Sequence, residues 1–360
     1  PTRRSSDLHP NMSLTLEDIA HLSGVSRSTV SRVINGDENV SPATRQRVLD
    51  AIQKHNYQPN QAARRLAAGR TDTFGLVIAA RVGATFNDPY FSQVIQGVSN
   101  ACNQQDYSLM LWLSDLEHER RILRHITNNN LMDGVIVSFT LSDDPIVETL
   151  SRGQLPFVII GHHANPDINS VDLDHQQAAY LATRHLLEHG FRRIATICGP
   201  RTQIAGQDRL QGFEQALTEA GLFDSRLIVE GDFGETSGYN AMQELLPQKP
   251  EALFAANDIM AAGAYRAIYE AGLKIPDDIA LIGFDDIPLA AQLNPPLTTI
   301  RQPLHRLGQL AVERLIEMVV EQGRDTVIEQ GRDILQQNPA RQMTLPPELV
   351  IRQSWPANHS

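Results

Sequence analysis

Between residues 73 and 300, short apolar runs alternate with longer segments in which apolar residues recur every three or four positions. The runs are nearly continuous, as in strands that are buried on both faces of a sheet. They read TFGLVIA, SLMLWL, GVIVSF, PFVIIG, RIATIC, ALFAA and IALIGF. The segments between them predict amphipathic helices at Tyr90–Gln105, His175–His189, Arg209–Ala220 and Asn257–Ala271. This alternation predicts parallel sheets with helices on both faces.

There are enough predicted strands for two such sheets, and we place the division between them near Ser170–Asp174. The predicted fold class is therefore α/β, with two doubly wound parallel sheets in two lobes. Open α/β sheets bind ligands beyond the carboxyl ends of their strands. Polar residues that directly follow a strand are thus the first candidates for a binding site.

The front of the chain has a different pattern, which predicts three short helices. Thr15 is the expected N-cap of the first helix, and Gly24 supplies the turn that ends it. Ser26 is expected to cap the second helix, RSTVSRVIN, and Pro42 to begin the third. Two short helices joined by a small glycine-containing turn form a helix-turn-helix unit.

The third helix is expected to pack against the first two through Val48, Leu49 and Ile52. In the second helix, Val30 and Val33 predict the buried face, while hydroxyl groups and arginines occupy the other face. Hydroxyls near a helix N-terminus can bond phosphate, and arginines can reach base edges in the major groove. The candidate major-groove residues are Arg27, Ser28, Thr29, Ser31, Arg32 and Asn35. The alternative is a three-helix bundle with a solvated polar face.

An alanine-rich segment, QAARRLAAG, predicts a fourth helix within residues 58–70. A helix of about two turns is not stable alone in water, so we expect it to need a partner copy and DNA. An apolar side chain flanked by arginines suits insertion into the minor groove at a kinked step. The candidate minor-groove residues are Asn60, Ala63 and Leu66. An alanine-rich linker helix is the alternative.

The net charge also differs between the front of the chain, up to residue 70, and the rest of it. The formal net charge is −11, yet residues 12–70 hold eight Lys or Arg and five Asp or Glu. Residues 71–360 therefore carry about −15. A basic front on an acidic body indicates that only the front meets a polyanion such as DNA.

The composition also indicates where the protein is located and which ligands it does not bind. Cys102 and Cys198 lack metal-site spacing and predict buried, reduced thiols, as in the cytoplasm, where nucleoid DNA also lies. No apolar run reaches the roughly 18–20 residues of a membrane-spanning helix. Residues 1–12 are expected to be a disordered leader without a secretory signal. We expect no metal, no cofactor and no membrane partner.

Enzyme motifs are missing from the sequence. It has no G-x-S-x-G elbow, no H-E-x-x-H pair, no P-loop and no glycine-rich dinucleotide fingerprint. The adjacent acids Asp285 and Asp286 have no second catalytic group beside them. We therefore expect a binding protein and no enzyme. A sugar-binding receptor without a regulatory role is the rival in a different class, but it would need export.

Polar and aromatic residues that follow strands predict a small-molecule site. Carboxylate, guanidinium and amide groups can bond hydroxyls, and an aromatic ring can pack on apolar C–H faces. The candidate effector-binding residues are Asp88, Tyr90, Phe91, His162, Arg209, Phe233, Asn257 and Asp285. Arg209 is expected to open its helix.

Each of these candidates has a structural alternative. Asn257, Asp258 and Asp286 are also natural helix N-caps. Tyr90 and Phe91 are alternatively core residues at a helix start, and His162 an exposed loop residue.

The motifs TLEDIAHLSGVSRSTVSRVING, NYQPNQAARRLA, HLLEHGFRRIATICGP, LFAANDIMAAGAYRAI, IPDDIALIGFDDIPLA and PPLTTIRQP resemble the LacI/GalR family of bacterial transcriptional regulators. The resemblance covers nearly all of residues 13–355. It implies two lobes like those of periplasmic sugar-binding proteins. It further implies operator contacts from Arg27, Ser28 and Arg32, a minor-groove wedge at Leu66, and effector contacts from Arg209, Asn257, Asp285 and Phe233.

The resemblance also implies a domain organisation. Residues 13–57 form the helix-turn-helix domain, 58–70 the hinge helix, and 71–360 the effector-binding and dimerisation domain. The first lobe spans about 71–171 and 301–335, and the second about 172–300 and 336–360.

The function implied is a homodimeric repressor that binds double-stranded operator DNA under the control of a small-molecule effector. Helix Pro303–Gln322 and the face near Tyr90–Gln105 are the implied dimer surfaces. A sugar effector is favoured, since purine-binding members have an additional arginine near the position of Gln203; a purine- or nucleoside-responsive regulator is the alternative. Induction and corepression both stay open.

One segment departs from the family pattern. The sequence EQGRD occurs at 321–325 and again at 329–333, which we interpret as a duplication that lengthens a surface loop. An altered crossover or partner contact is the alternative. The chain ends without heptads, so no tetramer built on a C-terminal coiled coil is expected.

Overall fold

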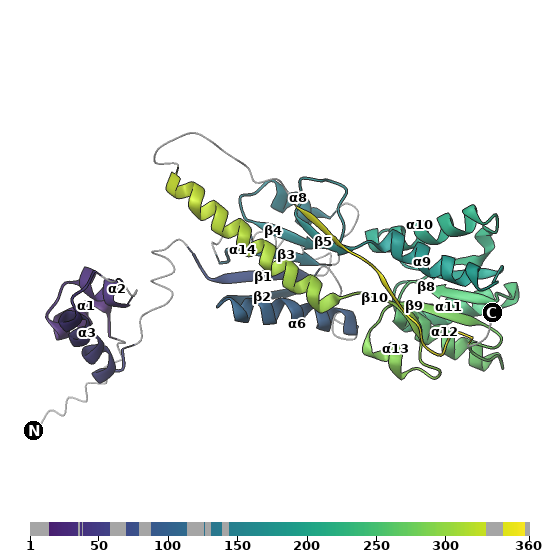
Figure 1. The fold of residues 1–360 in the computed structure, drawn as a ribbon, viewed down its shortest axis with the longest axis horizontal. Helices are drawn as coiled ribbons and strands as arrows, with labels where there is room; N and C mark the ends of the chain where they lie inside the picture. The colour runs from purple at the N-terminus through teal and green to yellow at the C-terminus, as the bar shows by residue number, and fades with distance from the viewer. Residues whose placement is uncertain are drawn as a thin grey trace, which may run out of the picture. The chain divides into compact units, whose positions relative to one another are not determined.

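The computed structural model describes residues 14–34, 37, 39–57, 70–78, 88–113, 126, 131–138, 144–328 and 341–356, without the side chains of 323–328. The chain divides into two compact units, residues 1–71 and 72–360 (Figure 1). Several sequence expectations lie outside the described residues. They are the leader at 1–12, Asn35, the hinge segment up to residue 69 with Asn60, Ala63 and Leu66, and the second EQGRD copy.

The N-terminal unit contains three helices, α1 (Leu16–Ser23), α2 (Arg27–Ile34) and α3 (Pro42–Lys54). Thr15 caps α1 through a capping box: its hydroxyl accepts from the Asp18 amide at 3.3 Å, and the Asp18 carboxylate accepts from the Thr15 amide at 2.7 Å. The Asp18 carboxylate also accepts from the Thr15 hydroxyl at 2.7 Å, and the two hydrogen bonds that it accepts from Thr15 lower its pKa. Gly24 ends α1 at φ +64°, a left-handed conformation that favours glycine. The predicted cap and turn are confirmed.

The core of this unit is formed by Ile19, Val30, Val33, Val48 and Tyr57. The expectation that Leu49 joins this core is wrong, because its side chain is 43% exposed. In a helix, adjacent residues point about 100° apart, so burying Val48 turns the next side chain towards solvent.

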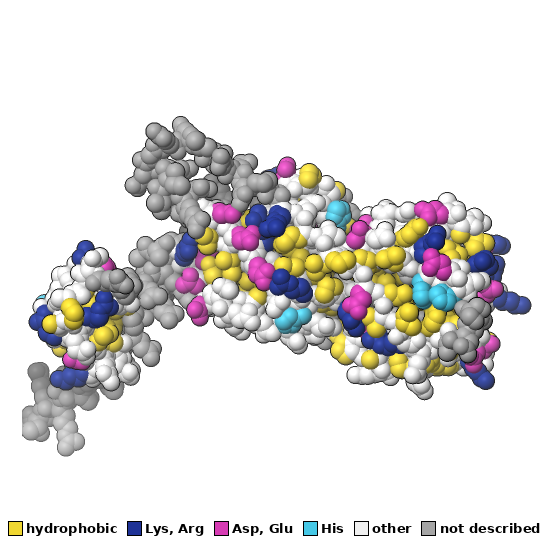
Figure 2. Space-filling view, viewed as in Figure 1, with side chains coloured by type: hydrophobic (Ala, Val, Ile, Leu, Met, Phe, Trp, Pro, Cys, Tyr) yellow, Lys and Arg dark blue, Asp and Glu magenta, His cyan; other side chains and the backbone are white. Residues whose placement is uncertain are grey.

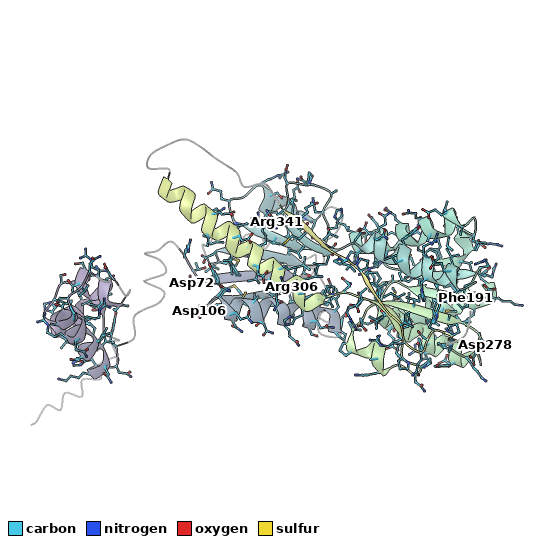
Figure 3. All side chains as sticks on the ribbon, viewed as in Figure 1. Asp72, Asp106, Phe191, Asp278, Arg306 and Arg341 are labelled. Atoms are coloured by element: carbon cyan, nitrogen blue, oxygen red, sulfur yellow. The ribbon has the colours of Figure 1, made fainter. Side chains whose placement is uncertain are left out.

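The first sheet of the C-terminal unit has the strand order β11–β5–β4–β3–β1–β2, and every described pair is parallel. Its strands are β1 (Thr73–Ile78), β2 (Ser108–Leu113), β3 (Gly134–Ser138), β4 (Phe157–Ile160), β5 (Ser170–Leu173) and β11 (Gln342–Leu345). Helices α6 (Pro89–Gln104) and α14 (Leu304–Ile328) pack together on one face, and α8 (Pro145–Ser151) adds to the core on the other. Asp72 and Asp106 lie at the neighbouring amino ends of β1 and β2 (Figure 3), where the Ser108 amide donates to the Asp72 carbonyl at 2.8 Å.

The second sheet has the order β12–β10–β9–β8–β6–β7 and is parallel except for the antiparallel edge strand β12. Its strands are β6 (Ile194–Cys198), β7 (Ile228–Glu230), β8 (Ala252–Ala255), β9 (Ala280–Asp285), β10 (Thr298–Arg301) and β12 (Glu348–Val350). One face is covered by α9 (His175–Glu188) and α10 (Ile204–Glu219), and the other by α11 (Glu235–Leu245) and α12 (Asp258–Glu270) (Figure 1). A short helix α13 (Pro288–Gln292) follows β9. The predicted α/β class with two doubly wound sheets is confirmed.

The chain passes between the two sheets after β5, after β10 and between β11 and β12. Two lobe boundaries therefore need correction: all of β5 and β11 belong to the first sheet, beyond the expected ends at 171 and 335. The segment of β11 is hard to assign from sequence, because only Met343 and Leu345 alternate towards the first core. Helix α14 continues to Ile328, so the first EQGRD copy is helical and not part of a loop.

Candidate functional site

A pocket lies between the two lobes of the C-terminal unit, with about 640 Å³ of empty space including open solvent. Its wall contains all eight residues that the sequence pointed to: Asp88, Tyr90, Phe91, His162, Arg209, Phe233, Asn257 and Asp285. The fold thus brings together residues that are spread over about 200 positions of the chain.

The first lobe contributes the start of α6 to the pocket. Asp88 is the N-cap of that helix, and its carboxylate accepts from the Tyr90 amide at 2.8 Å. Burial raises the pKa of Asp88 and that of the Tyr90 phenol, which therefore stays a hydrogen-bond donor. Phe91 is only 3% exposed and belongs to the core of this lobe as well as to the pocket wall. Phe91 is thus a core residue, the structural alternative that the sequence offered, and it also borders the pocket.

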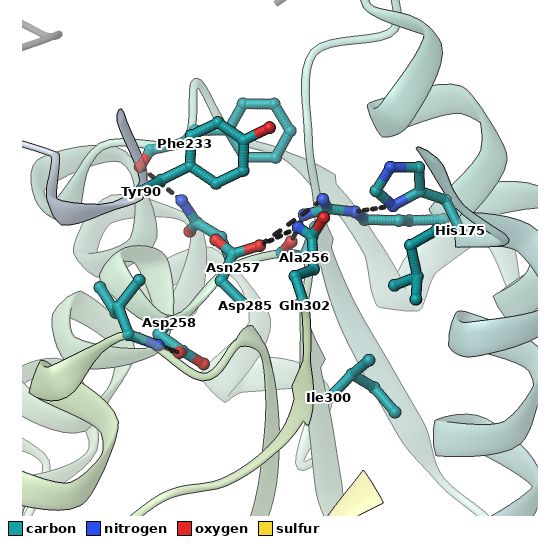
Figure 4. A network of polar contacts seen from close by, with 12 residues as sticks. Tyr90, His175, Phe233, Ala256, Asn257, Asp258, Asp285, Ile300 and Gln302 are labelled. Carbon is teal, nitrogen blue, oxygen red and sulfur yellow. Dashed lines mark hydrogen bonds and ion pairs between the residues drawn. The ribbon is translucent and has the colours of Figure 1, made fainter. Parts of the chain in front are cut away.

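Arg209 makes polar contacts with His175, Ala256 and Asp285, three residues that are labelled in Figure 4. Its Nε donates to Nδ1 of His175 at 3.3 Å, one terminal nitrogen donates to the Ala256 carbonyl, and the other is 3.6 Å from the Asp285 carboxylate. The guanidinium carbon lies 3.8 Å from the centre of the Phe284 ring, a cation–π contact. Arg209 does not open its helix as expected, since α10 begins at Ile204. Gln203 makes no side-chain cap there, so the sequence carries no capping signal at the true start.

Asp285 ends β9 and faces this arginine. Its carboxylate also accepts from Nε2 of Gln302 at 2.5 Å. Burial raises the pKa of Asp285 to about 7, although Arg209 and the Gln302 hydrogen bond act in the opposite direction. The backbone φ angles of Asp285 and Asp286 are +110° and +56°, values that residues other than glycine rarely adopt. Such conformations cost about 1–3 kcal/mol each and concentrate at functional sites.

Asn257 is a helix cap, the structural alternative that the sequence offered, and it also lies in the pocket wall. It caps α12 by accepting from the Met260 amide at 2.8 Å, and its side-chain amide donates to the Phe233 carbonyl at 3.0 Å. Phe233 has φ of +67°, so this hydrogen bond fixes a left-handed residue whose ring lines the pocket. Asn257 thus positions the aromatic wall.

The neighbouring acids have structural roles that differ from the capping alternative. Asp258 is buried and accepts from the Thr299 hydroxyl at 2.6 Å and from the Ile287 amide at 3.0 Å. Asp286 pairs with Arg301 at 2.7 Å and with Arg352 at 2.6 Å. Asp286 is not a helix cap, because α13 starts at Pro288 after Ile287.

Sequence reasoning missed several residues of the pocket wall. They are Ile160, Gly161, Asp172, His175, Gln203, Ile204 and Ala205. Asp172 and His175 sit where the chain leaves β5 for α9, so a polar residue at a strand end was the available signal. This signal is hard to recognise in the sequence, because the strand SVDL is short. Only the folded chain shows that it ends at Leu173, where the chain crosses to the second lobe.

In the N-terminal unit, the face of α2 is arranged as the sequence predicts. Arg27, Ser28 and Arg32 are exposed, Thr29 and Ser31 half-buried. The Ser26 hydroxyl lies 2.8 Å from the hydroxyls of both Ser28 and Thr29. Arg32 lies 3.8 Å from Asp37, and Figure 2 shows Lys and Arg side chains on the surface of this unit. The arginines project to solvent while the hydroxyls are already bonded at the helix start.

The described part of the chain holds no group of three or more His, Cys, Asp or Glu arranged to bind a metal ion. None of the helices described is both long and apolar enough to cross a bilayer. Cys102 and Cys198 are buried free thiols, and burial raises the pKa of Cys102 to about 11.

A part of each unit matches a known protein family. Residues 15–60 match the bacterial regulatory proteins of the lacI family, and residues 183–355 match the periplasmic binding protein-like domain. The chain is 40% identical over 303 residues to the HTH-type transcriptional regulator CelR of Thermobifida fusca, covering 82% of this chain and 88% of that protein. This chain belongs to the LacI family of transcriptional regulators.

Other members of the LacI family are similarly close. Identity is 38% to the HTH-type transcriptional repressor PurR of Aliivibrio fischeri, over 83% of this chain and 90% of that protein. It is also 38% to the ribose operon repressor of Escherichia coli K12, over 83% and 91%. A CelR–cellobiose complex superposes with a TM-score of 0.72 at 33% identity, covering 95% of this chain and all of that one. The lac repressor dimer bound to operator and an anti-inducer gives 0.81 at 29% identity, covering 95% and 98%.

The LacI-family chain is therefore a DNA-binding transcriptional regulator and not an enzyme. The expected family and fold are confirmed by these matches. The roles of individual residues at the pocket and on α2 stay predictions.

Proposed function

We propose that this LacI-family regulator represses genes of carbohydrate metabolism and that a sugar in the interlobe pocket controls its affinity for operator DNA. The observation that carries this proposal is the composition of the pocket wall. Asp88 and Asp285 offer carboxylates for hydroxyl groups, Tyr90 offers a hydroxyl, and Phe233 offers a ring for apolar C–H faces. The relative CelR forms a complex with cellobiose, and another relative is a ribose operon repressor.

For DNA we propose a homodimer with one α2 helix in each major-groove half-site. In helix-turn-helix dimers the half-sites lie about 34 Å apart, and the two-fold symmetry of the dimer makes the operator near-palindromic. The proposed base and phosphate contacts come from α2 and the residue after it: Arg27, Ser28, Thr29, Ser31, Arg32 and Asn35. Residues 58–70 serve as the hinge, with Asn60, Ala63 and Leu66 at the minor groove. Residues 71–360 carry the effector pocket and the dimer surfaces, and the dimer acts in the cytoplasm on the nucleoid.

The coupling between the two ligands follows from the shared chain. An effector that bonds both lobes favours one interlobe angle, and the hinge segment leads directly into β1 of the first lobe. A change in that angle in both copies changes how the DNA-binding domains meet the operator. Coupling of this kind is reciprocal, so the operator changes the effector affinity by the same factor.

The test uses the purified full chain and genomic fragments of its source. Fragments retained by the protein are sequenced, and the binding of an enriched fragment is then titrated with a panel of sugars. We expect a near-palindromic site and a sugar that changes its affinity about fivefold or more, the usual scale of allosteric coupling. The absence of any enriched site would contradict the proposed regulator.

A purine effector is the second candidate, favoured by the 38% identity to PurR. Gln203 lines the pocket where the resemblance places an arginine in purine-binding members, which supports a sugar instead. Hypoxanthine, guanine and adenosine in the same titration separate the two. A response to these and to no sugar would replace the sugar proposal.

A further inference from the structure

The pocket wall contains a buried acid–imidazole pair that takes no part in the assignments above. Nε2 of His175 donates to Oδ1 of Asp172 at 3.1 Å, and the Leu173 amide donates to the same oxygen at 2.8 Å. Arg209 donates to the other ring nitrogen of His175, at 3.3 Å, so the proton of the neutral ring must lie on Nε2. Arg209 therefore fixes the tautomer of His175, and His175 fixes the orientation of the Asp172 carboxylate.

The second oxygen of Asp172 is left over. Oδ2 is shielded from solvent and has no hydrogen-bond partner among the described residues. Asp172 is 7% exposed overall and lines the pocket. A buried acceptor without a partner costs free energy, and native proteins rarely leave one unexplained. A donor supplied by a ligand would satisfy it.

The charges around the pocket favour a donor without negative charge. Among the described residues of the wall, three carry a carboxylate, Asp88, Asp172 and Asp285, and one carries a guanidinium, Arg209. Each of the three nitrogens of Arg209 already contacts an acceptor of the protein. The amino end of α10 at Gln203 has no side-chain cap and adds the equivalent of about half a positive charge. The guanidinium and this half charge together do not offset the three carboxylates. A phosphate group would add nearly two further negative charges to a pocket that is already negative.

We infer that Asp172, oriented by His175, accepts a hydrogen bond from a ligand hydroxyl, and that the pocket selects uncharged polyhydroxyl ligands over their phosphate esters. The inference rests on the proposed function, because it concerns the same pocket. Asp172 is thereby a specificity-determining residue, His175 a positioning residue, and the uncapped end of α10 an N–H donor for a ligand oxygen.

The experiment measures ligand binding by calorimetry with the full chain at pH 8, where an ordinary histidine is uncharged. The probes are ribose, glucose and cellobiose, and the matched esters ribose 5-phosphate, glucose 6-phosphate and cellobiose 6-phosphate. We expect at least one free sugar to bind and its ester to bind at least tenfold more weakly. Asp172→Asn keeps the shape but replaces one acceptor with a donor, so the free sugar should bind about tenfold more weakly. The ratio between free sugar and ester should also fall.

Asp174→Asn is the matched control, because Asp174 caps the same helix by accepting from the Gln177 amide at 2.8 Å but does not line the pocket. It should leave both the stability and the ratio nearly unchanged, because asparagine caps a helix about as well as aspartate does. An ester that binds as well as its free sugar, or an unchanged ratio in Asp172→Asn, overturns the inference while leaving a sugar-responsive regulator intact. A chain that binds none of the six probes overturns this inference together with the sugar proposal. The wild-type comparison needs no variant, so the charge argument is tested even if Asp172→Asn fails to fold.

Discussion

Arg209 and Asp285 form an ion pair at 3.6 Å in which each side chain is no more than 6% exposed. The two residues come from different elements, the helix α10 and the end of strand β9, and both line the interlobe pocket. The pair connects the pocket to two passages between the lobes, through His175 after β5 and through Gln302 after β10. A ligand that contacts this pair therefore contacts two residues that are hydrogen-bonded to the segments connecting the lobes.

Replacing Arg209 with alanine should destabilise the C-terminal unit by about 3–5 kcal/mol, because it leaves the Asp285 carboxylate buried without its partner. Urea unfolding monitored by circular dichroism measures the loss. Arg266→Ala is the control, since Arg266 pairs with Glu235 at 3.3 Å while both side chains are about half exposed. An exposed pair contributes about 0–1 kcal/mol. Equal losses in the free energy of unfolding would show that the buried pair contributes no more to stability than the exposed one.

The raised pKa of Asp285 predicts a pH dependence of stability. With a folded-state pKa of about 7 against an ordinary value of 3.8, the folded chain holds this proton more tightly than the unfolded chain does. The stabilising contribution of this group is complete below pH 3.8 and is lost as the pH rises to about 7. Wild type should therefore lose more stability between pH 5 and about pH 7.5 than Asp285→Asn does. Asp278→Asn, at an exposed site, controls for the removal of a carboxylate, and parallel profiles for all three proteins would refute the assignment.

Asp285→Asn should also weaken effector binding while sparing operator binding in the absence of effector. The substitution replaces a charged acceptor, and a hydrogen bond to a charged group contributes about 1.5–3 kcal/mol, or roughly tenfold or more in affinity. Calorimetry with the responding sugar and gel shifts with the enriched operator fragment measure the two effects. An unchanged effector affinity would remove Asp285 from the proposed contacts.

Arg32→Ala should weaken specific operator binding by about 1–3 kcal/mol if Arg32 holds a bidentate base contact. Its exposed contact with Asp37 at 3.8 Å gives little stability, so folding should be nearly unchanged. Lys54→Ala removes one positive charge from the same unit but lies at the end of α3. Binding to a set of single-base operator variants distinguishes the two: only Arg32→Ala should relax the preference at one position. A uniform loss in both variants would indicate phosphate contacts alone.

Gly212→Ala tests the close packing of α9 against α10. A Cβ at Gly212 would lie 2.1 Å from the Gln176 carbonyl oxygen, so the helices must separate. Overpacking of this kind costs about 1–3 kcal/mol. Because α10 carries Arg209 and α9 begins at His175, effector affinity should fall along with stability. Gly153→Ala is the control, with its nearest contact at an ordinary 3.4 Å, and a similar effect there would argue against helix separation.

The sequence determined the local structure and the chemistry of the candidates. Continuous apolar runs predicted the strands, although β2 has no buried residue because it lies at the edge of its sheet. The caps at Thr15, Gly24 and Pro42 are correct because capping depends on residues within one turn. The charge division and the polar residues after the strands pointed to DNA for the front and to a small molecule for the body.

The tertiary structure alone decided which of those residues meet. Strand β11 joins the first sheet through pairing with β5, and pairing across about 170 residues leaves no local signal. Asp172 was passed over although His175 lies only three residues further along the chain, because the arrangement of the pair in the pocket depends on Arg209, which donates to His175 from α10. The pKa of Asp285 likewise arises from burial by distant elements. Local patterns act through bonds and neighbours within a few residues, whereas burial, strand order and pocket geometry depend on contacts that only the folded chain makes.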